Sequence, residues 1–133
     1  MAYSEWHLVA KTKSYHVSNV KLLDYLDQAR TEWYHFCKGL GVEAVVVHIS
    51  ADYKKEVFDG DPIMIRTWME RVGNTSFAIK QIMEREPLER IVEAEVILTT
   101  IDCQSRIKVS VPFEVRQLLH QDINLKTVLT CED

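Results

Sequence analysis

One long helical pattern, followed by a run of strand patterns, is the feature that most constrains the fold of this chain. Over Val20–Leu40 the apolar residues recur at three- and four-residue steps and form one stripe along the predicted helix. Ser18 or Asn19 is expected to cap its start. Gly39 and Gly41 are expected to end it. A helix with a single apolar stripe must pack that stripe against another layer.

Strand patterns supply this second layer. The predicted strands are Tyr3–Lys11, Ala44–Tyr53, Ile63–Arg71, Phe77–Glu86, Ile91–Asp102 and Ile107–Val111, and a last helical segment is predicted at Phe113–His120. The connections between the later strands are short and can only reverse the chain, so these strands are expected to be antiparallel neighbours. We therefore expect an α+β domain in which one helix packs on a curved antiparallel sheet of five to six strands.

A single helix covers only one face of such a sheet. By strand alternation, Trp68, Ile82 and Val96 are predicted to point to the other face. An exposed apolar surface that extends over several strands usually marks an interface between proteins. We therefore expect an obligate homo-oligomer, either a dimer or a tetramer.

Composition narrows the class of protein. The chain has 133 residues, and we expect 1–133 to form a single domain. With 16 Lys and Arg against 20 Asp and Glu, its net charge of −4 offers no positive field for nucleic acid. The cysteines Cys37, Cys103 and Cys131 are odd in number and lack CxxC spacing, which fits a reducing cytoplasm. We see no signal-peptide pattern and no apolar run of membrane-spanning length, so we expect a soluble cytoplasmic protein.

Several reactive residue types have structural explanations. Cys37 lies on the apolar side of the predicted helix and is expected to be a core residue rather than a nucleophile. Asp59-Gly60-Asp61 precedes a strand, and we interpret it as a tight turn rather than a cation site. Four histidines are scattered without ligand spacing, so no metal or other cofactor is expected: His7, His35, His48 and His120. No phosphate-binding glycine loop and no GxSxG motif is present.

The loop before the helix carries a more specific signal. Its run His16-Val17-Ser18-Asn19, followed by Leu22–Arg30 with Asp27-Gln28-Ala29-Arg30, resembles the hotdog-fold acyl-thioester hydrolases of the 4-hydroxybenzoyl-CoA thioesterase type. Further segments resemble the family's later elements in the expected order: Ala51–Tyr53, Phe58–Ile63, Ile65–Trp68 and Val111–Arg116. The resemblance extends over about residues 3–120. It implies a hotdog fold whose sheets pair edge to edge, with active sites between subunits.

The resemblance also implies roles for the loop residues, with one departure. The family's carboxylate falls four residues before the motif histidine, and this chain has Thr12 there. A threonine hydroxyl cannot accept a proton at neutral pH as a carboxylate does. The resemblance assigns the oxyanion-binding N–H to the backbone of Asn19, the activation or orientation of water to His16, and a hydrogen bond to the thioester sulfur or carbonyl to Tyr15. The alternative is that His16 and Asn19 only brace the loop and cap the helix.

Other residues are secondary candidates. Asp27 and Glu32, on the predicted helix, are acids within possible reach of the substrate, the latter across a dimer. Tyr53 ends a predicted strand, and Lys54 and Lys55 follow it. All three are expected to bind the substrate, with the pantetheine arm passing the two lysines.

The sequence therefore predicts an acyl thioesterase that hydrolyses acyl-CoA or acyl-carrier-protein thioesters. A fatty or polyketide acyl chain is favoured over an aromatic one. Two alternatives stay open. One is a non-catalytic acyl-thioester-binding hotdog protein, which the absence of the carboxylate at Thr12 favours. The other is a hotdog dehydratase, against which the chain lacks a suitably placed histidine and carboxylate pair.

Overall fold

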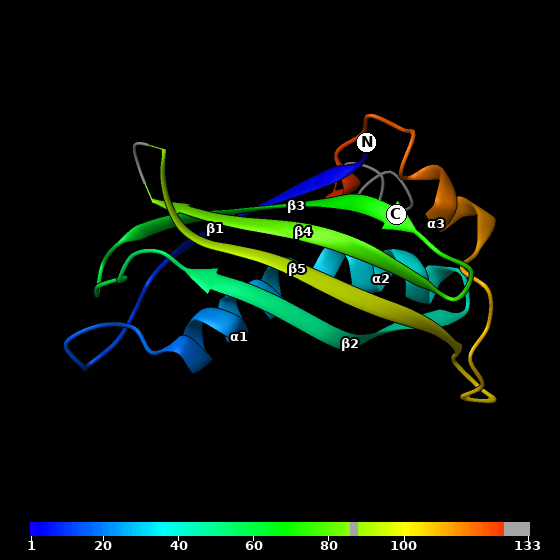
Figure 1. Cartoon of the computed structure of the whole chain (residues 1–133), viewed down its shortest axis with the longest axis horizontal. Helices are drawn as coiled ribbons and strands as arrows, with labels where there is room; N and C mark the ends of the chain where they lie inside the picture. Colours follow the sequence, from blue (N-terminus) through cyan, green and yellow to red (C-terminus); the bar gives the residue numbers. More distant parts are fainter. Residues whose placement is uncertain (86–87, 127–133) are drawn as a thin grey trace.

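The computed structural model describes residues 1–85 and 88–126. These residues form a five-stranded antiparallel sheet in the order β1-β3-β4-β5-β2, and helices α1 and α2 lie against one face of it, around which the sheet curves (Figure 1). The predicted α+β architecture is thus confirmed. The strands are β1 (Tyr3–Val9), β2 (Val42–Tyr53), β3 (Pro62–Val72), β4 (Ser76–Arg85) and β5 (Glu89–Asp102), and the helices are α1 (Asn19–Ala29), α2 (Thr31–Gly39) and α3 (Phe113–Gln117).

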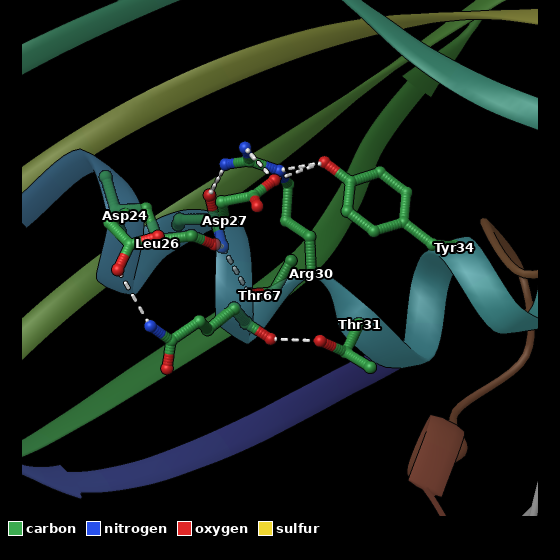
Figure 2. Close-up of polar contacts among 9 residues, drawn as sticks. Asp24, Leu26, Asp27, Arg30, Thr31, Tyr34 and Thr67 are labelled. Carbon is green, nitrogen blue, oxygen red and sulfur yellow. Dashed lines mark hydrogen bonds and ion pairs between the residues drawn. The ribbon is translucent and has the colours of Figure 1, made fainter.

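The predicted continuous helix is interrupted at Arg30, which separates α1 from α2. This residue has φ −89° and ψ 3°, outside the helical range. Arg30 is 3% exposed, and its side chain donates hydrogen bonds to the amide oxygen of Gln81 on β4 and to the hydroxyl of Tyr34, both at 2.8 Å. Figure 2 shows the guanidinium between Asp27 and Tyr34. A buried guanidinium requires such partners because leaving it unpaired is costly, and they hold Arg30 where the two helices meet.

The core lies between the helices and the sheet and consists of two clusters. One gathers under α2 around Trp33, Phe77 and Leu98, and the other under α1 around Leu26 and Ile65. Each cluster uses one side of its helix, as the apolar stripe predicted. The Trp33 indole is 1% exposed, and its Nε1 donates to the hydroxyl of a buried β1 residue at 2.9 Å, so its polar atom is also satisfied.

The outer face of the sheet differs from the expectation. Val96 is opposite Ile79 and both lie in the helix-facing core, so its predicted outward orientation is wrong. Ile82 does lie opposite Glu93, but it is only 2% exposed. Trp68 is half-buried. Charged side chains reach across this face to form the ion pairs Arg66–Glu84 between β3 and β4, Arg71–Glu95 between β3 and β5, and Lys54–Glu93 beside β5. This face is therefore largely charged, and the predicted exposed apolar patch is absent from its described residues.

The segment after β5 also differs from the expectation. Residues 107–111 do not form the predicted strand, because β4 begins opposite Thr99 and only the last residues of β5 extend past it. A single antiparallel bridge joins Ile101 to Lys108. The last predicted helix is shorter than expected and ends at Gln117. Within 1–85 and 88–126, no helix has the length and apolar character needed to cross a membrane. Cys131 and Glu86, the end of the predicted strand Phe77–Glu86, lie outside the described residues.

Cys37 behaves as the core residue that the helical stripe predicted. It is 2% exposed and belongs to the cluster under α2. Burial raises the pKa of its thiol to about 12, because a thiolate is poorly solvated in an apolar environment. At pH 8 the reactive thiolate is therefore about one part in ten thousand.

The core under α2 gives a stability prediction. Trp33→Ala removes a fully buried ring and a buried hydrogen bond, and we expect it to lower the free energy of unfolding by about 3–5 kcal/mol. Urea denaturation at one fixed protein concentration measures this change. Ile107→Ala, at a 65% exposed side chain, is the control and should stay within about 0.5 kcal/mol. Equal stability of the two variants would contradict the assigned core.

The buried thiol gives a second prediction. Iodoacetamide at pH 8 should leave Cys37 unmodified in the folded protein and modify it once urea has unfolded the chain, because only unfolding exposes the thiol and lowers its pKa. Peptide mass spectrometry measures the modified fraction of each cysteine. Rapid modification of Cys37 in the folded protein would show that the thiol is accessible and reopen its role as a nucleophile.

Candidate functional site

Two segments that are distant in the sequence lie side by side at one end of the sheet: the loop between β1 and α1, and the turn before β3. The Val17 N–H donates to the Val57 carbonyl at 2.8 Å. The Gly60 N–H donates to the Ala10 carbonyl at 2.8 Å, and the Ala10 N–H donates to the Asp61 carbonyl at 2.9 Å. These backbone bonds hold both ends of the loop that carries the motif residues.

The turn itself has the tight geometry predicted for Asp59-Gly60-Asp61. Gly60 has a φ of +87°, a left-handed conformation that favours glycine. The Asp61 carboxylate accepts a hydrogen bond from the Phe58 N–H at 2.8 Å and forms an ion pair with Arg85 at 2.6 Å. Asp61 therefore closes the turn and connects it to the end of β4.

The start of α1 provides free hydrogen-bond donors beside this loop. Ser18 is the N-cap, since its side-chain oxygen accepts from the Lys21 N–H at 3.2 Å, so Ser18 and not Asn19 fills that role. Within the described residues, the N–H groups of Asn19 and Val20 have no acceptor. Unpaired N–H groups at a helix start carry the positive end of the helix dipole and bind developing negative charge.

The side chains of His16 and Tyr15 in the motif loop, residues 11–18, are open to solvent. His16 is exposed, and its Nδ1 lies 3.0 Å from the Val17 carbonyl oxygen. In the tautomer that donates this bond, Nε2 has a free lone pair. Tyr15 is 87% exposed, and its ring packs edge-on against Phe58 with the centroids 6.2 Å apart. Both side chains are therefore accessible to a ligand at the start of α1.

The residue at the position of the family's carboxylate has a different partner. The Thr12 hydroxyl accepts from the Ser14 N–H at 3.0 Å, and the Thr12 N–H donates to the Asp59 carboxylate at 2.9 Å. The sequence pattern around Asp59 indicates only a turn. The two residues are 47 positions apart, and no local pattern in either segment indicates their contact.

The two helix acids lie away from this loop. Asp27 is two helical turns beyond Asn19, about 12 Å along the axis, and its carboxylate accepts from Arg30 at 3.1 Å and from Tyr34 at 3.0 Å (Figure 2). Burial is the main cause that raises the pKa of the Tyr34 hydroxyl. Glu32 belongs to the first turn of α2, where it is 8% exposed and its Oε2 has no hydrogen-bond partner in the described part of the chain.

The predicted substrate-binding residues lie on the segment that leads into the turn. Tyr53 ends β2 and is 40% exposed. The Lys54 N–H donates to the Ile91 carbonyl at 2.7 Å, and its ammonium group lies 3.9 Å from Glu93. Lys55 is exposed and only two residues before Val57, which binds the motif loop. Lys54 thus already has an acidic neighbour, whereas Lys55 has no ion pair in the described part of the chain.

A cavity of about 390 Å³ opens at the same end of the sheet, where β1 ends and β3 begins. Its lining residues come from three strands and the chain beyond β4: His7, Leu8, Val9, Pro62, Ile63, Met64, Glu84, Arg85 and Leu88. Among the described residues, no three His, Cys, Asp or Glu side chains gather in a way that could hold a metal ion.

Comparisons with known proteins identify the family. A family model described as the Thioesterase superfamily matches residues 15–92. Curated proteins gave no match to the sequence. Among solved structures, a 1,4-dihydroxy-2-naphthoyl-CoA thioesterase from Synechocystis is similar at 14% identity and a TM-score of 0.74, over 90% of this chain and 96% of that chain.

Two further solved structures are similar in the same way. YbaW, described as a probable thioesterase from Escherichia coli, has 19% identity and a TM-score of 0.76, over 87% of this chain and 96% of that chain. SAV2348 from Staphylococcus aureus, solved in complex with CoA, has 10% identity and a TM-score of 0.78, over 90% of this chain and 85% of that chain. These likenesses confirm the expected hotdog fold. Because the family model matches more than half of its length, this chain belongs to the thioesterase superfamily.

Proposed function

We propose that this chain is a cytoplasmic acyl thioesterase that acts as a single domain and hydrolyses acyl-CoA or acyl-carrier-protein thioesters. The observation that carries the proposal is the pair of free N–H groups at Asn19 and Val20, beside an exposed loop, in a member of the thioesterase superfamily. A fatty or polyketide acyl chain is the substrate that we favour. The complex of the similar SAV2348 with CoA supports a CoA-type thioester.

The chemistry follows from the charge that develops during hydrolysis. When water attacks the thioester carbonyl, the carbonyl oxygen becomes negative, and donors aimed at it stabilise the transition state more than the ground state. The N–H of Asn19 is the donor we assign to this oxygen. It is already held in place by the helix, so no reorganisation is needed during the reaction.

His16 and Tyr15 are proposed to position the reacting groups. The free Nε2 of His16 suits a hydrogen bond with the attacking water, and the Tyr15 hydroxyl suits one with the thioester sulfur or carbonyl. Lys55 is proposed to contact a phosphate group at the end of the phosphopantetheine arm. Lys54 contributes less in this proposal, because Glu93 already balances its charge.

The open edge of β2 supports a second copy of this chain as partner. β2 pairs with β5 on one side, and its other side has no strand partner in residues 1–85 and 88–126. Its second half is exposed, including Val47 (58%), Ile49 (37%) and Tyr53 (40%). A long edge strand with exposed apolar residues is a ready template for pairing. We propose edge-to-edge pairing at β2 in a homodimer, with a tetramer as a higher assembly.

One observation favours a second candidate function, a non-catalytic acyl-thioester-binding protein. Thr12 occupies the position of the family's carboxylate, and the motif loop 11–18 contains no acid. The same free N–H groups would then bind a thioester carbonyl without activating water. The two functions differ only in whether a thiol is released.

A thiol-release assay tests the proposed function. We expect release from at least one member of a panel of saturated, hydroxylated, polyketide-type and aromatic acyl-CoA and acyl-carrier-protein thioesters. Free thiol is measured with a chromogenic disulfide. Binding of an acyl-CoA without release from any member of the panel would support the binding protein instead, and dehydration of a hydroxyacyl thioester would indicate the dehydratase.

The role of His16 gives a further prediction. His16→Ala should lower kcat/KM by about 10²-fold, the size expected when an attacking group is no longer held in position. The oligomer and the thermal midpoint should not change, because the side chain is exposed. His120→Ala, at an exposed position after α3, is the control. If the His16→Ala variant hydrolysed the thioester at the unmutated rate, the role of His16 would be only to brace the loop.

The dimer has its own test. Ile49→Lys introduces a charge on the open edge and should shift the protein toward monomer in sedimentation velocity at micromolar concentration. Val9→Lys makes the same change at a 56% exposed residue on the opposite edge strand and should leave the assembly unchanged. If only Val9→Lys shifted the protein toward monomer, the interface would have to lie at β1 instead of β2.

A further inference from the structure

Hydrolysis of a thioester by water requires a group that accepts the proton of the water, and the motif loop offers no carboxylate for it. Residues 11–18 contain no Asp or Glu. The Thr12 hydroxyl is a very weak base and already accepts from the Ser14 N–H. His16 is the residue that we assign to orienting the water, so a carboxylate that accepts the proton must come from another segment. The turn before β3 is the segment bonded directly to this loop.

The turn contains two acids, Asp59 and Asp61, and the Asp61 carboxylate already has hydrogen-bond and ion-pair partners. Its carboxylate pairs with Arg85 and accepts from the Phe58 N–H. The pKa of Arg85 is raised, because the lowering effect of burial is outweighed by its hydrogen bonds and ion pairs with Asp61 and Glu89. Asp61 thus has a structural role that leaves it poorly suited to take a proton.

Asp59 has the opposite properties. One carboxylate oxygen, Oδ1, accepts from the Thr12 N–H at 2.9 Å, which places the group against the motif loop. The other oxygen has no hydrogen-bond partner in the described part of the chain, and the residue is exposed. One oxygen is therefore fixed by the backbone while the second is open to a water molecule.

The helix acids do not offer this combination. Asp27 is bound by Arg30 and Tyr34 and lies about 12 Å along α1 from Asn19. Glu32 lies beyond the helix break and is 8% exposed. Asp59 is the acid that is both accessible and hydrogen-bonded to the loop preceding the free N–H groups.

We propose that Asp59 is the general base of the reaction, an inference that rests on the proposed thioesterase function. The Asp59 carboxylate takes a proton from water as the water oxygen bonds to the carbonyl carbon, and the carbonyl π electrons move to the oxygen held by the Asn19 N–H. The tetrahedral intermediate then re-forms the carbonyl and breaks the carbon–sulfur bond. The leaving thiolate takes the proton from Asp59, which gives a thiol and a carboxylic acid and restores the carboxylate.

Two substitutions at one position separate this role from a structural one. In Asp59→Asn the amide oxygen still accepts from the Thr12 N–H but cannot act as the base, whereas Asp59→Ala loses both functions. A base role predicts that both variants lower kcat by about 10²-fold or more with KM nearly unchanged. A purely structural role predicts that Asp59→Asn stays active and only Asp59→Ala is impaired.

The assay uses the acyl thioester that the unmutated protein turns over fastest, with thermal unfolding of each variant measured in parallel. Asp24→Asn, at an exposed acid on α1 that bonds Gln28, is the matched control and should keep full activity. Loss of kcat in a folded Asp59→Asn variant supports the proposal, and kcat within threefold of the unmutated protein overturns it. If the unmutated protein releases no thiol from any thioester, the proposed function fails first and this inference fails with it.

Discussion

The backbone hydrogen bonds between the loop before α1 and the turn before β3 are the constraint on which the candidate site depends. Ordering each residue of a free loop costs about 1–2 kcal/mol, and the loop before α1 has mostly exposed side chains that contribute little burial. The bonds from Val17 to Val57 and from Gly60 to Ala10 hold this loop instead. They fix the first residues of α1 relative to the sheet, and with them the free N–H of Asn19.

A second constraint acts at the other end of α1. The guanidinium of Arg30 reaches Gln81 on β4, and Gln81 in turn donates to the Leu26 carbonyl at 3.0 Å and to Thr67 on β3 at 3.1 Å. Each polar group of this buried network has a partner, which is the condition under which such a network stabilises one arrangement. α1 is therefore attached to the sheet at its last turn by Arg30 and at its first turn by the motif loop.

Local patterns in the sequence predicted much of this fold and less of the site. The five strands of the sheet, the Ser18 cap and the turn at Asp59–Asp61 follow from side-chain types and short spacings, and all are present. The break at Arg30 was missed because the apolar stripe continues through it, and only the position of Gln81 explains why a charged residue is buried there. The contact between Asp59 and Thr12 joins positions 47 residues apart and appears only when the sheet has assembled.

In the proposed complex the thioester carbonyl binds at the start of α1, between the helix N–H groups and Asp59. A crystal structure with a non-hydrolysable acyl-CoA analogue, in which a methylene group replaces the sulfur, tests this placement. We expect the ketone oxygen about 3 Å from the Asn19 nitrogen, with a water molecule between the carbonyl carbon and the Asp59 carboxylate. A ketone bound in the cavity lined by His7, Met64 and Glu84, with no hydrogen bond from the Asn19 N–H, would show that this placement is wrong.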